Sequence, residues 1–271
     1  MGHVLSTMLV GFPYFMVMFA LPLRMQVVSQ KTALMAGISL LPTLGTVAIG
    51  SVIGGAVNGN RDYKFPTLVL GSIFMTIGCA ALSTIDATGG SQGGIYGFQV
   101  FVGLGFGVLI STVSAAAAME CEIRDNSTSP STSHFAPANK TTAVAQGIIA
   151  QVRIFGGSIG IAASTAILGA SQRRNLTGLV SPSQLANLQS FSKTASIEQL
   201  RAIQKTYSEA FSTDMKVSAA VAGAAVLAAV LTFQREKVDV QERHKERHIE
   251  EGKRQRALAE AKSKASRGNA V

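Results

Sequence analysis

Six stretches of this chain are each long and apolar enough to cross a lipid bilayer as a helix. The hydrocarbon core of a bilayer requires about 20 predominantly apolar residues per helix. The residues of these stretches do not alternate in polarity as the strands of a membrane β-barrel do. We therefore predict an all-α, polytopic integral membrane protein in which residues 1–233 form one bundle of six transmembrane helices. The expected spans are 4–23, 34–57, 65–85, 96–119, 144–170 and 217–233.

Charged residues are rare in this bundle and dense after it. Only 14% of the 271 residues are charged, whereas charged residues make up about a quarter of an ordinary soluble domain. Residues 234–271 alone hold 11 of the 24 lysines and arginines. This distribution excludes a soluble enzyme and a disordered chain, and Cys79 and Cys121 are too few for a disulfide scaffold or a metal site. The net charge of +9 requires no nucleic acid partner, because basic residues that flank membrane spans produce it.

The basic residues also predict the orientation of the bundle. If the N-terminus is cytosolic, the segments on the cytosolic side hold 15 lysines and arginines, and the segments on the opposite side hold eight. Loops rich in lysine and arginine stay in the cytosol, so both ends of the chain are expected there. The segments counted as cytosolic are 58–64, 120–143 and 234–271.

The two longest loops differ in character. Residues 120–143 form a polar stretch of Ser, Thr, Pro and Asn without periodicity, which predicts a flexible linker. Residues 171–216 are expected to be an extracytoplasmic loop that contains an amphipathic helix, because a capping-box pattern occurs at Ser196–Gln199. Apolar residues then recur at helical spacing at Leu200, Ile203, Tyr207 and Phe211. This helix is expected to cover the outer face and to run into the sixth span.

Residues 234–271 are predicted to be a charged cytosolic tail, either as a solvated helix or as a disordered segment. Its basic residues also suit contact with anionic lipid. His244 and His248 are four residues apart, but the run is H-K-E-R-H and a third ligand is not evident. We therefore expect no metal site here.

Pairs of glycines four residues apart recur in the predicted spans. Each pair leaves a flat stripe on one helix face, where the backbone of another helix can approach closely. Such stripes suit helices that slide past one another, and they suit static packing equally. Gly103–Gly107 does not match G-x-G-x-x-G and follows no strand, so nucleotide binding is not expected. The pairs are Gly50/Gly54, Gly55/Gly59, Gly103/Gly107 and Gly156/Gly160.

Arg153 is a charged residue well inside a predicted span. A charge there costs at least about 2.5–3.5 kcal/mol unless it is paired or faces water. Arg153 either lines a cavity, where it binds an anionic substrate or modulates proton coupling, or it snorkels to the inner interface. The six predicted spans contain no Asp or Glu, so the membrane carboxylate that a proton-driven carrier usually has would have to come from elsewhere. Further candidates for a substrate cavity are Tyr14, Met18, Gln26, Gln99 and Gln151.

Five runs of sequence carry a resemblance to a known family. They are LPLRMQVVSQKTALMAGISLLP (21–42), GGAVNGNRDYKFP (54–66), GFQVFVGLGFGVLIST (97–112), AQGIIAQVRIFGGSIGIAAS (145–164) and YSEAFSTDMKV (207–217). Together they resemble the C-terminal half of the major facilitator superfamily, and more narrowly the fungal fourteen-span drug:proton antiporters of the multidrug and toxin efflux type. The cytosolic loop motif of that family is matched loosely by Gly55, Arg61, Asp62, Tyr63, Lys64 and Pro66.

The resemblance implies one six-helix major-facilitator half-bundle. It implies the efflux of small, mostly apolar organic molecules or toxins in exchange for protons, by alternating access. It also implies that Tyr14, Met18 and Gln99 face the substrate path and that Arg153 lies near it. The alternative is a non-transporting membrane remnant or a regulatory partner, because the family carries an N-terminal half that this chain lacks.

Enzyme chemistry, a cofactor and a metal are not expected, because the sequence shows no nucleophile–base pairing, metal cluster or phosphate loop. The expected partners are the lipid bilayer, a small-molecule substrate, protons, and either the N-terminal half or a second copy of the chain. The expected location is the plasma membrane, with the vacuolar membrane as the alternative.

Overall fold

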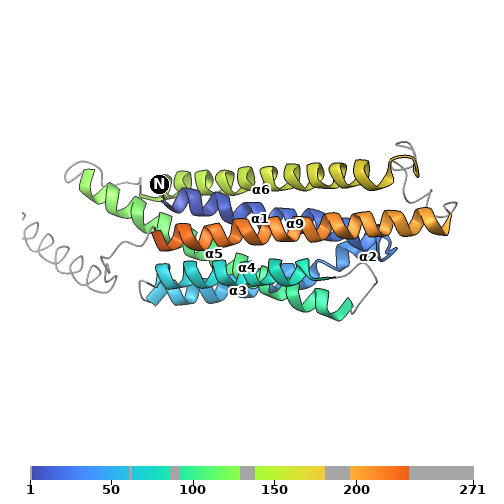
Figure 1. The fold of residues 1–271 in the computed structure, drawn as a ribbon. Helices are drawn as coiled ribbons and strands as arrows, with labels where there is room; N and C mark the ends of the chain where they lie inside the picture. The colour runs from blue at the N-terminus through green and yellow to red at the C-terminus, as the bar shows by residue number, and fades with distance from the viewer. Residues whose placement is uncertain (1, 61–62, 86–91, 129–137, 181–195, 232–271) are drawn as a thin grey trace, which may run out of the picture.

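The computed structural model describes residues 2–60, 63–85, 92–128, 138–180 and 196–231, and nearly all of them are helical (Figure 1). Arg61, Asp62, His244, His248 and the predicted charged tail lie outside these ranges. In chain order the helices are α1 (Gly2–Val27), α2 (Ala33–Ile38), α3 (Leu41–Asn60), α4 (Lys64–Ser83), α5 (Gln92–Thr128), α6 (Ala138–Leu176) and α9 (Ile197–Leu231).

Six segments of the described chain are long and apolar enough to cross a membrane. This confirms the all-α fold class predicted from the sequence. The segments are Thr7–Val27, Ala33–Gly59, Lys64–Ser83, Gly93–Ala118, Thr142–Leu176 and Ile197–Val230.

The helices lie side by side in two groups of three (Figure 1). One group contains α1, α6 and α9, and the other contains α3, α4 and α5. The groups meet mainly where α9 packs on α4. Because successive spans run in opposite directions, α1, α4 and α6 end where α3, α5 and α9 begin (Figure 1). We call that end of the bundle the distal end.

The core is apolar and receives side chains from α1, α4, α5 and α9. Tyr14 of α1 stacks on Phe106 of α5, with ring centroids 3.5 Å apart and ring planes 3° from parallel. In a bilayer the lipid tails are as apolar as these side chains, so helix association depends on close packing. The fully buried members include Val17, Leu21, Met25, Cys79, Leu82, Val102, Leu109 and Met215.

Glycines allow the closest helix contacts. A Cβ atom added to Gly107 of α5 would lie within 3.0 Å of the α3 backbone at Val47, and one added to Gly156 of α6 would meet the α1 backbone at Met8. Gly160 is as close to Phe12. Gly50, Gly54 and Gly103 make equally close approaches between α3 and α5. By contrast, an added Cβ on Gly55 or Gly59 would meet nothing within 4 Å, so the expected stripe at this pair contacts no helix of the described chain.

One expected boundary is corrected. The segment 120–143, predicted to be a flexible linker, is helical at both ends, since α5 continues to Thr128 and α6 begins at Ala138. The predicted amphipathic helix continues without a break into the residues of the expected sixth span, and together they form one helix, α9. The helix begins at the predicted capping box: the Ser196 backbone N–H donates to Gln199 Oε1 and the Gln199 N–H donates to Ser196 Oγ, each at 3.2 Å.

Candidate functional site

The unbroken course of α9 places a carboxylate inside the bundle. The sixth span was expected to begin at residue 217, which left Asp214 outside it and all six spans without an acidic residue. In the structure, the helical segment Ile197–Val230, which is long and apolar enough to cross a membrane, runs through Asp214. The Asp214 residue is only 3% exposed. Asp214 also follows Ile203, Tyr207 and Phe211 at helical spacing, so it continues the buried face of the helix.

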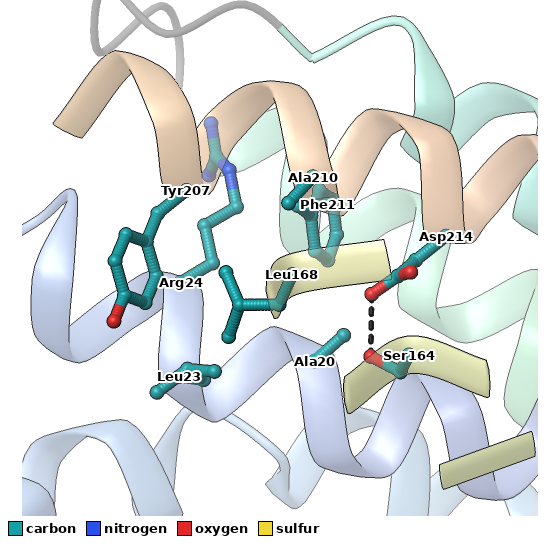
Figure 2. A pocket seen from close by; sticks show the side chains of 9 residues that line it. All are labelled: Ala20, Leu23, Arg24, Ser164, Leu168, Tyr207, Ala210, Phe211 and Asp214. Atoms are coloured by element: carbon teal, nitrogen blue, oxygen red, sulfur yellow. Dashed lines mark hydrogen bonds between the residues drawn. The ribbon is translucent and has the colours of Figure 1, made fainter. Parts of the chain in front are cut away.

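Asp214 lines a small pocket between α1, α6 and α9 (Figure 2). Its Oδ2 accepts a hydrogen bond from Ser164 Oγ of α6 at 2.5 Å, the dashed line in Figure 2. Its Oδ1 is buried and has no hydrogen-bond partner in the part of the chain that the structure describes. The other lining residues are Ala20, Leu23, Arg24, Leu168, Tyr207, Ala210 and Phe211.

Arg24 brings a second charge to this pocket. It lies in the last turn of α1 and is 3% exposed. Its guanidinium carbon is 5.2 Å from the centroid of the Phe211 ring, a distance at which a cation is attracted to the ring face. The C-terminal turn of a helix also favours a positive charge. Of the nine lining residues, Arg24 and Asp214 are the charged ones.

Two polar contacts join α3 to α5 away from this pocket. Near the distal end, Thr43 Oγ1 donates to Gln99 Oε1 at 2.9 Å, and Gln99 is fully buried. Near the opposite end, Asn58 Nδ2 donates to Thr112 Oγ1 at 3.0 Å and to the Gly54 carbonyl at 2.8 Å. A buried polar group needs such partners, so these contacts fix how the two helices meet.

The candidate cavity residues are spread over the bundle rather than gathered in one site. Tyr14 and Gln99 are buried, whereas Met18 and Gln26 are partly exposed. Gln151 is exposed. None of these residues lines the Asp214 pocket.

Arg153 of α6 is partly exposed and lies where α1 and α6 approach most closely. A Cβ on Gly11 of α1 would meet its backbone and its Cγ. It precedes Ser164 by eleven residues of helix, or about 16 Å. In the loop motif, Gly55 and Lys64 lie at the ends of α3 and α4 that face away from the distal end.

Sequence reasoning missed the pocket residues Arg24, Ser164 and Asp214. For Asp214 a signal was present: the apolar residues of the amphipathic helix recur every three or four positions, and the next position of that stripe is Asp214. For Ser164 no local signal separates it from the other serines and threonines of the fifth span.

The six long apolar helices define a polytopic helical membrane protein, and comparisons with known proteins identify its relatives. No protein-family model matches the chain. Over 87% of its length, the chain is 28% identical to the MFS-type transporter FPY5 of Fusarium mangiferae, of which the match covers 38%. Over 35% of its length, it is 34% identical to the dehydrocurvularin exporter of Aspergillus terreus, covering 16% of that protein. It is also 32% identical, over 35% of its length, to the efflux pump roqT of Penicillium rubens, and the match covers 17% of that protein.

These relatives confirm the resemblance predicted from the sequence: the chain is related to fungal transporters and efflux pumps of the major facilitator type. It spans about two fifths of the length of the Fusarium transporter, as one half of such a protein would. The relatives are transporters and not enzymes.

Proposed function

We propose that this chain is the C-terminal six-helix half of an exporter of small, mostly apolar organic compounds, which it exchanges for protons by alternating access. The observation that carries the proposal is the match over 87% of the chain to 38% of an MFS-type transporter. The names of two further relatives, a dehydrocurvularin exporter and an efflux pump, support the direction of transport and an organic substrate.

A complete translocation path then needs a second six-helix half, supplied by the remainder of a longer chain or by a second copy. The burial of the spans supports this need. In the apolar part of the segment that contains α3, only 17% of the residues are buried inside the bundle, and in that of α6 only 28% are buried. The corresponding share for α5 is 61%. Their exposed apolar faces suit lipid or a second bundle. Those faces include Ile49, Val52 and Ile53 on α3, and Ile154, Phe155 and Ile159 on α6.

Within this half, Tyr14, Met18 and Gln99 are the proposed substrate-path residues. Tyr14 and Met18 lie on α1 and Gln99 on α5, which contact each other through the Tyr14–Phe106 stack. Arg153 is proposed either to attract anionic groups to this path or to anchor α6 at the inner interface.

The proposed setting is the plasma membrane, with both termini in the cytosol, because the cytosolic segments then hold the excess of basic residues. The distal end of the bundle is then the outer end.

The second function, left open by the sequence, is that of a non-transporting membrane partner. The two functions are separated in a yeast strain that lacks its own drug exporters. One strain expresses this chain alone, and another expresses it joined to the N-terminal half of the Fusarium transporter. We expect the joined protein to export a fluorescent apolar dye, with export abolished by a protonophore. A joined protein that reaches the membrane in normal amount and exports nothing favours the non-transporting function.

A further inference from the structure

We propose that Asp214 is the proton-binding residue of this half-bundle, hydrogen-bonded to Ser164 in the pocket formed by α1, α6 and α9. The inference deepens the proposed function and rests on its proton exchange. It supplies the membrane carboxylate that a proton-driven carrier usually has.

The two carboxylate oxygens of Asp214 are in unequal surroundings. Oδ2 receives a hydrogen bond from Ser164 Oγ at 2.5 Å, a length typical of a hydroxyl that donates to a charged oxygen. Oδ1 is buried, and the described residues offer it no donor. A buried charged oxygen without a donor is costly, and that cost is smaller when the oxygen carries a proton, because the acid is neutral.

The Ser164 hydrogen bond acts in the opposite direction, because it stabilises the ionised carboxylate. Arg24 lines the same pocket from α1, with its guanidinium carbon 5.2 Å from the centroid of the Phe211 ring. From α6 the lining residues are Ser164 and Leu168, which carry no charge. The basic residues Arg173 and Arg174 of α6 are exposed and at least nine residues beyond Ser164, or about 13 Å.

Apart from Arg24, the described residues place no other charged side chain in the lining of the Asp214 pocket. On α9 itself, Tyr207 lines the pocket through its ring, and its hydroxyl accepts a hydrogen bond from Gln172. Glu209 is bonded to Asn175, and Lys216 is exposed. From α4, which also packs on α9, Cys79 is buried as a neutral core residue and the Ser83 carbonyl accepts a hydrogen bond from Ser212. Burial thus favours the protonated acid, while the Ser164 hydrogen bond favours the carboxylate.

The position of the pocket suits proton entry from one side. Arg24 is three residues from the end of α1 at Val27, so the pocket lies near the distal end of α1, whereas Asp214 lies 17 residues into α9. With the proposed orientation, a proton leaves a hydronium ion of the outside water and binds Asp214 Oδ1, which leaves a water molecule and a neutral carboxylic acid. When the bundle rearranges, the acid returns its proton to cytosolic water and becomes a carboxylate again. This is the direction in which protons move when they drive export.

The first test detects the proton itself and requires no transport. The 271-residue chain and its Asp214→Asn variant are purified into lipid, and infrared difference spectra are recorded over a pH series. We expect a carboxylic-acid C=O band in the wild-type chain that is lost as the pH rises and is absent from D214N. Glu209→Gln is the matched control, since it makes the same change five residues away outside the pocket, and it should keep the band. Absence of a D214N-sensitive band at every pH would overturn the inference.

A second variant keeps the test valid if D214N does not insert. Ser164→Ala removes the donor that stabilises the carboxylate, so the acid band should persist to higher pH than in the wild-type chain. An unchanged pH dependence of the band in S164A contradicts the role given to Ser164.

The transport readout separates this inference from the proposed function. In the joined transporter, D214N should lose accumulation driven by a proton gradient and keep movement of the dye down its own gradient, while E209Q keeps both. Proton-driven accumulation that survives in D214N overturns the role of Asp214 and leaves the proposed function standing. An Asp214 band in a joined protein that never moves the dye contradicts the proposed function and leaves the proton site standing.

Discussion

Tyr14 of α1 and Phe106 of α5 stack face to face with their ring centroids 3.5 Å apart, and this contact joins the two three-helix groups of the bundle. Aromatic pairs contribute about 0.5–1.5 kcal/mol beyond the area they bury. Tyr14→Ala should therefore lower the thermal unfolding temperature of the purified chain in detergent, whereas Tyr14→Phe keeps the ring and should leave it near the wild-type value. Equal unfolding temperatures for the two variants would show that the stack does not hold the groups together.

The approach of α6 to α1 depends on Gly156 and Gly160, which face the α1 backbone at Met8 and Phe12. Gly156→Leu or Gly160→Leu should force these backbones apart, at a cost of about 1–3 kcal/mol or more for overpacking. The matched control is Gly147→Leu on the same helix, where an added Cβ meets nothing within 4 Å. Thermal unfolding in detergent measures the difference. Normal stability in the Gly156 and Gly160 variants means that this face does not contact α1.

Thr112 is expected to stabilise the bundle through its partner on another helix. Its Oγ1 donates to the Val108 carbonyl and accepts a hydrogen bond from Asn58. Thr112→Val leaves the Asn58 amide without that acceptor, which should cost about 1–3 kcal/mol. Thr165→Val is the control, because Thr165 is exposed and its hydroxyl bonds only to the Ile161 carbonyl of its own helix in the described structure. Similar losses of stability in both variants would remove the special role of the Asn58–Thr112 contact.

A substitution of Arg153 distinguishes two explanations of its charge within a span: a residue near the substrate path, or a residue that snorkels to the interface. Arg153→Ala should leave membrane insertion unchanged and should lower dye export by the joined transporter, because the side chain is proposed to lie near the substrate path. Wild-type export rates in this variant would leave the interpretation in which Arg153 snorkels to the interface.

Glycosylation tests the orientation of the chain. The acceptor sequences begin at Asn126, Asn139 and Asn175. The proposed orientation places Asn126 and Asn139 in the cytosol, where they are not modified. Asn175 is on the outer side, but its side chain is bonded to Glu209 at 3.0 Å close to the span. We therefore expect an unglycosylated chain or a trace at Asn175. An endoglycosidase-sensitive mass shift that disappears in Asn126→Gln plus Asn139→Gln would reverse the topology.

Hydropathy alone was sufficient to predict six spans, because an apolar run of about 20 residues is typical of a helix that crosses a membrane. Hydropathy did not indicate that Asp214 belongs to the same long helix. Asp214 and Lys216 interrupt the apolar window, so the sixth span was expected to start at residue 217. The helix continues through both residues: Asp214 faces the bundle while Lys216 faces outward. Glycine spacing has a similar limit. It marks Gly50/Gly54 and Gly55/Gly59 alike, but only a three-dimensional arrangement shows that the first pair meets α5.

The residues that line the pocket with Asp214 could not be predicted, for a different reason. Ser164 and Asp214 are 50 residues apart in the chain, and Arg24 belongs to the first helix. Their meeting depends on α1, α6 and α9 packing together, which no local pattern encodes.

Proton-coupled transport by the joined protein in sealed lipid vesicles tests the central claim most directly. A pH gradient, acidic on the side that corresponds to the distal end, is imposed across the vesicle membrane, and the movements of the dye and of protons are recorded together. We predict that the dye accumulates on the acidic side while protons leave that side, and that both fluxes stop when the gradient is collapsed. Dye movement that is the same with and without the gradient, or no dye movement by correctly inserted protein, would contradict the account.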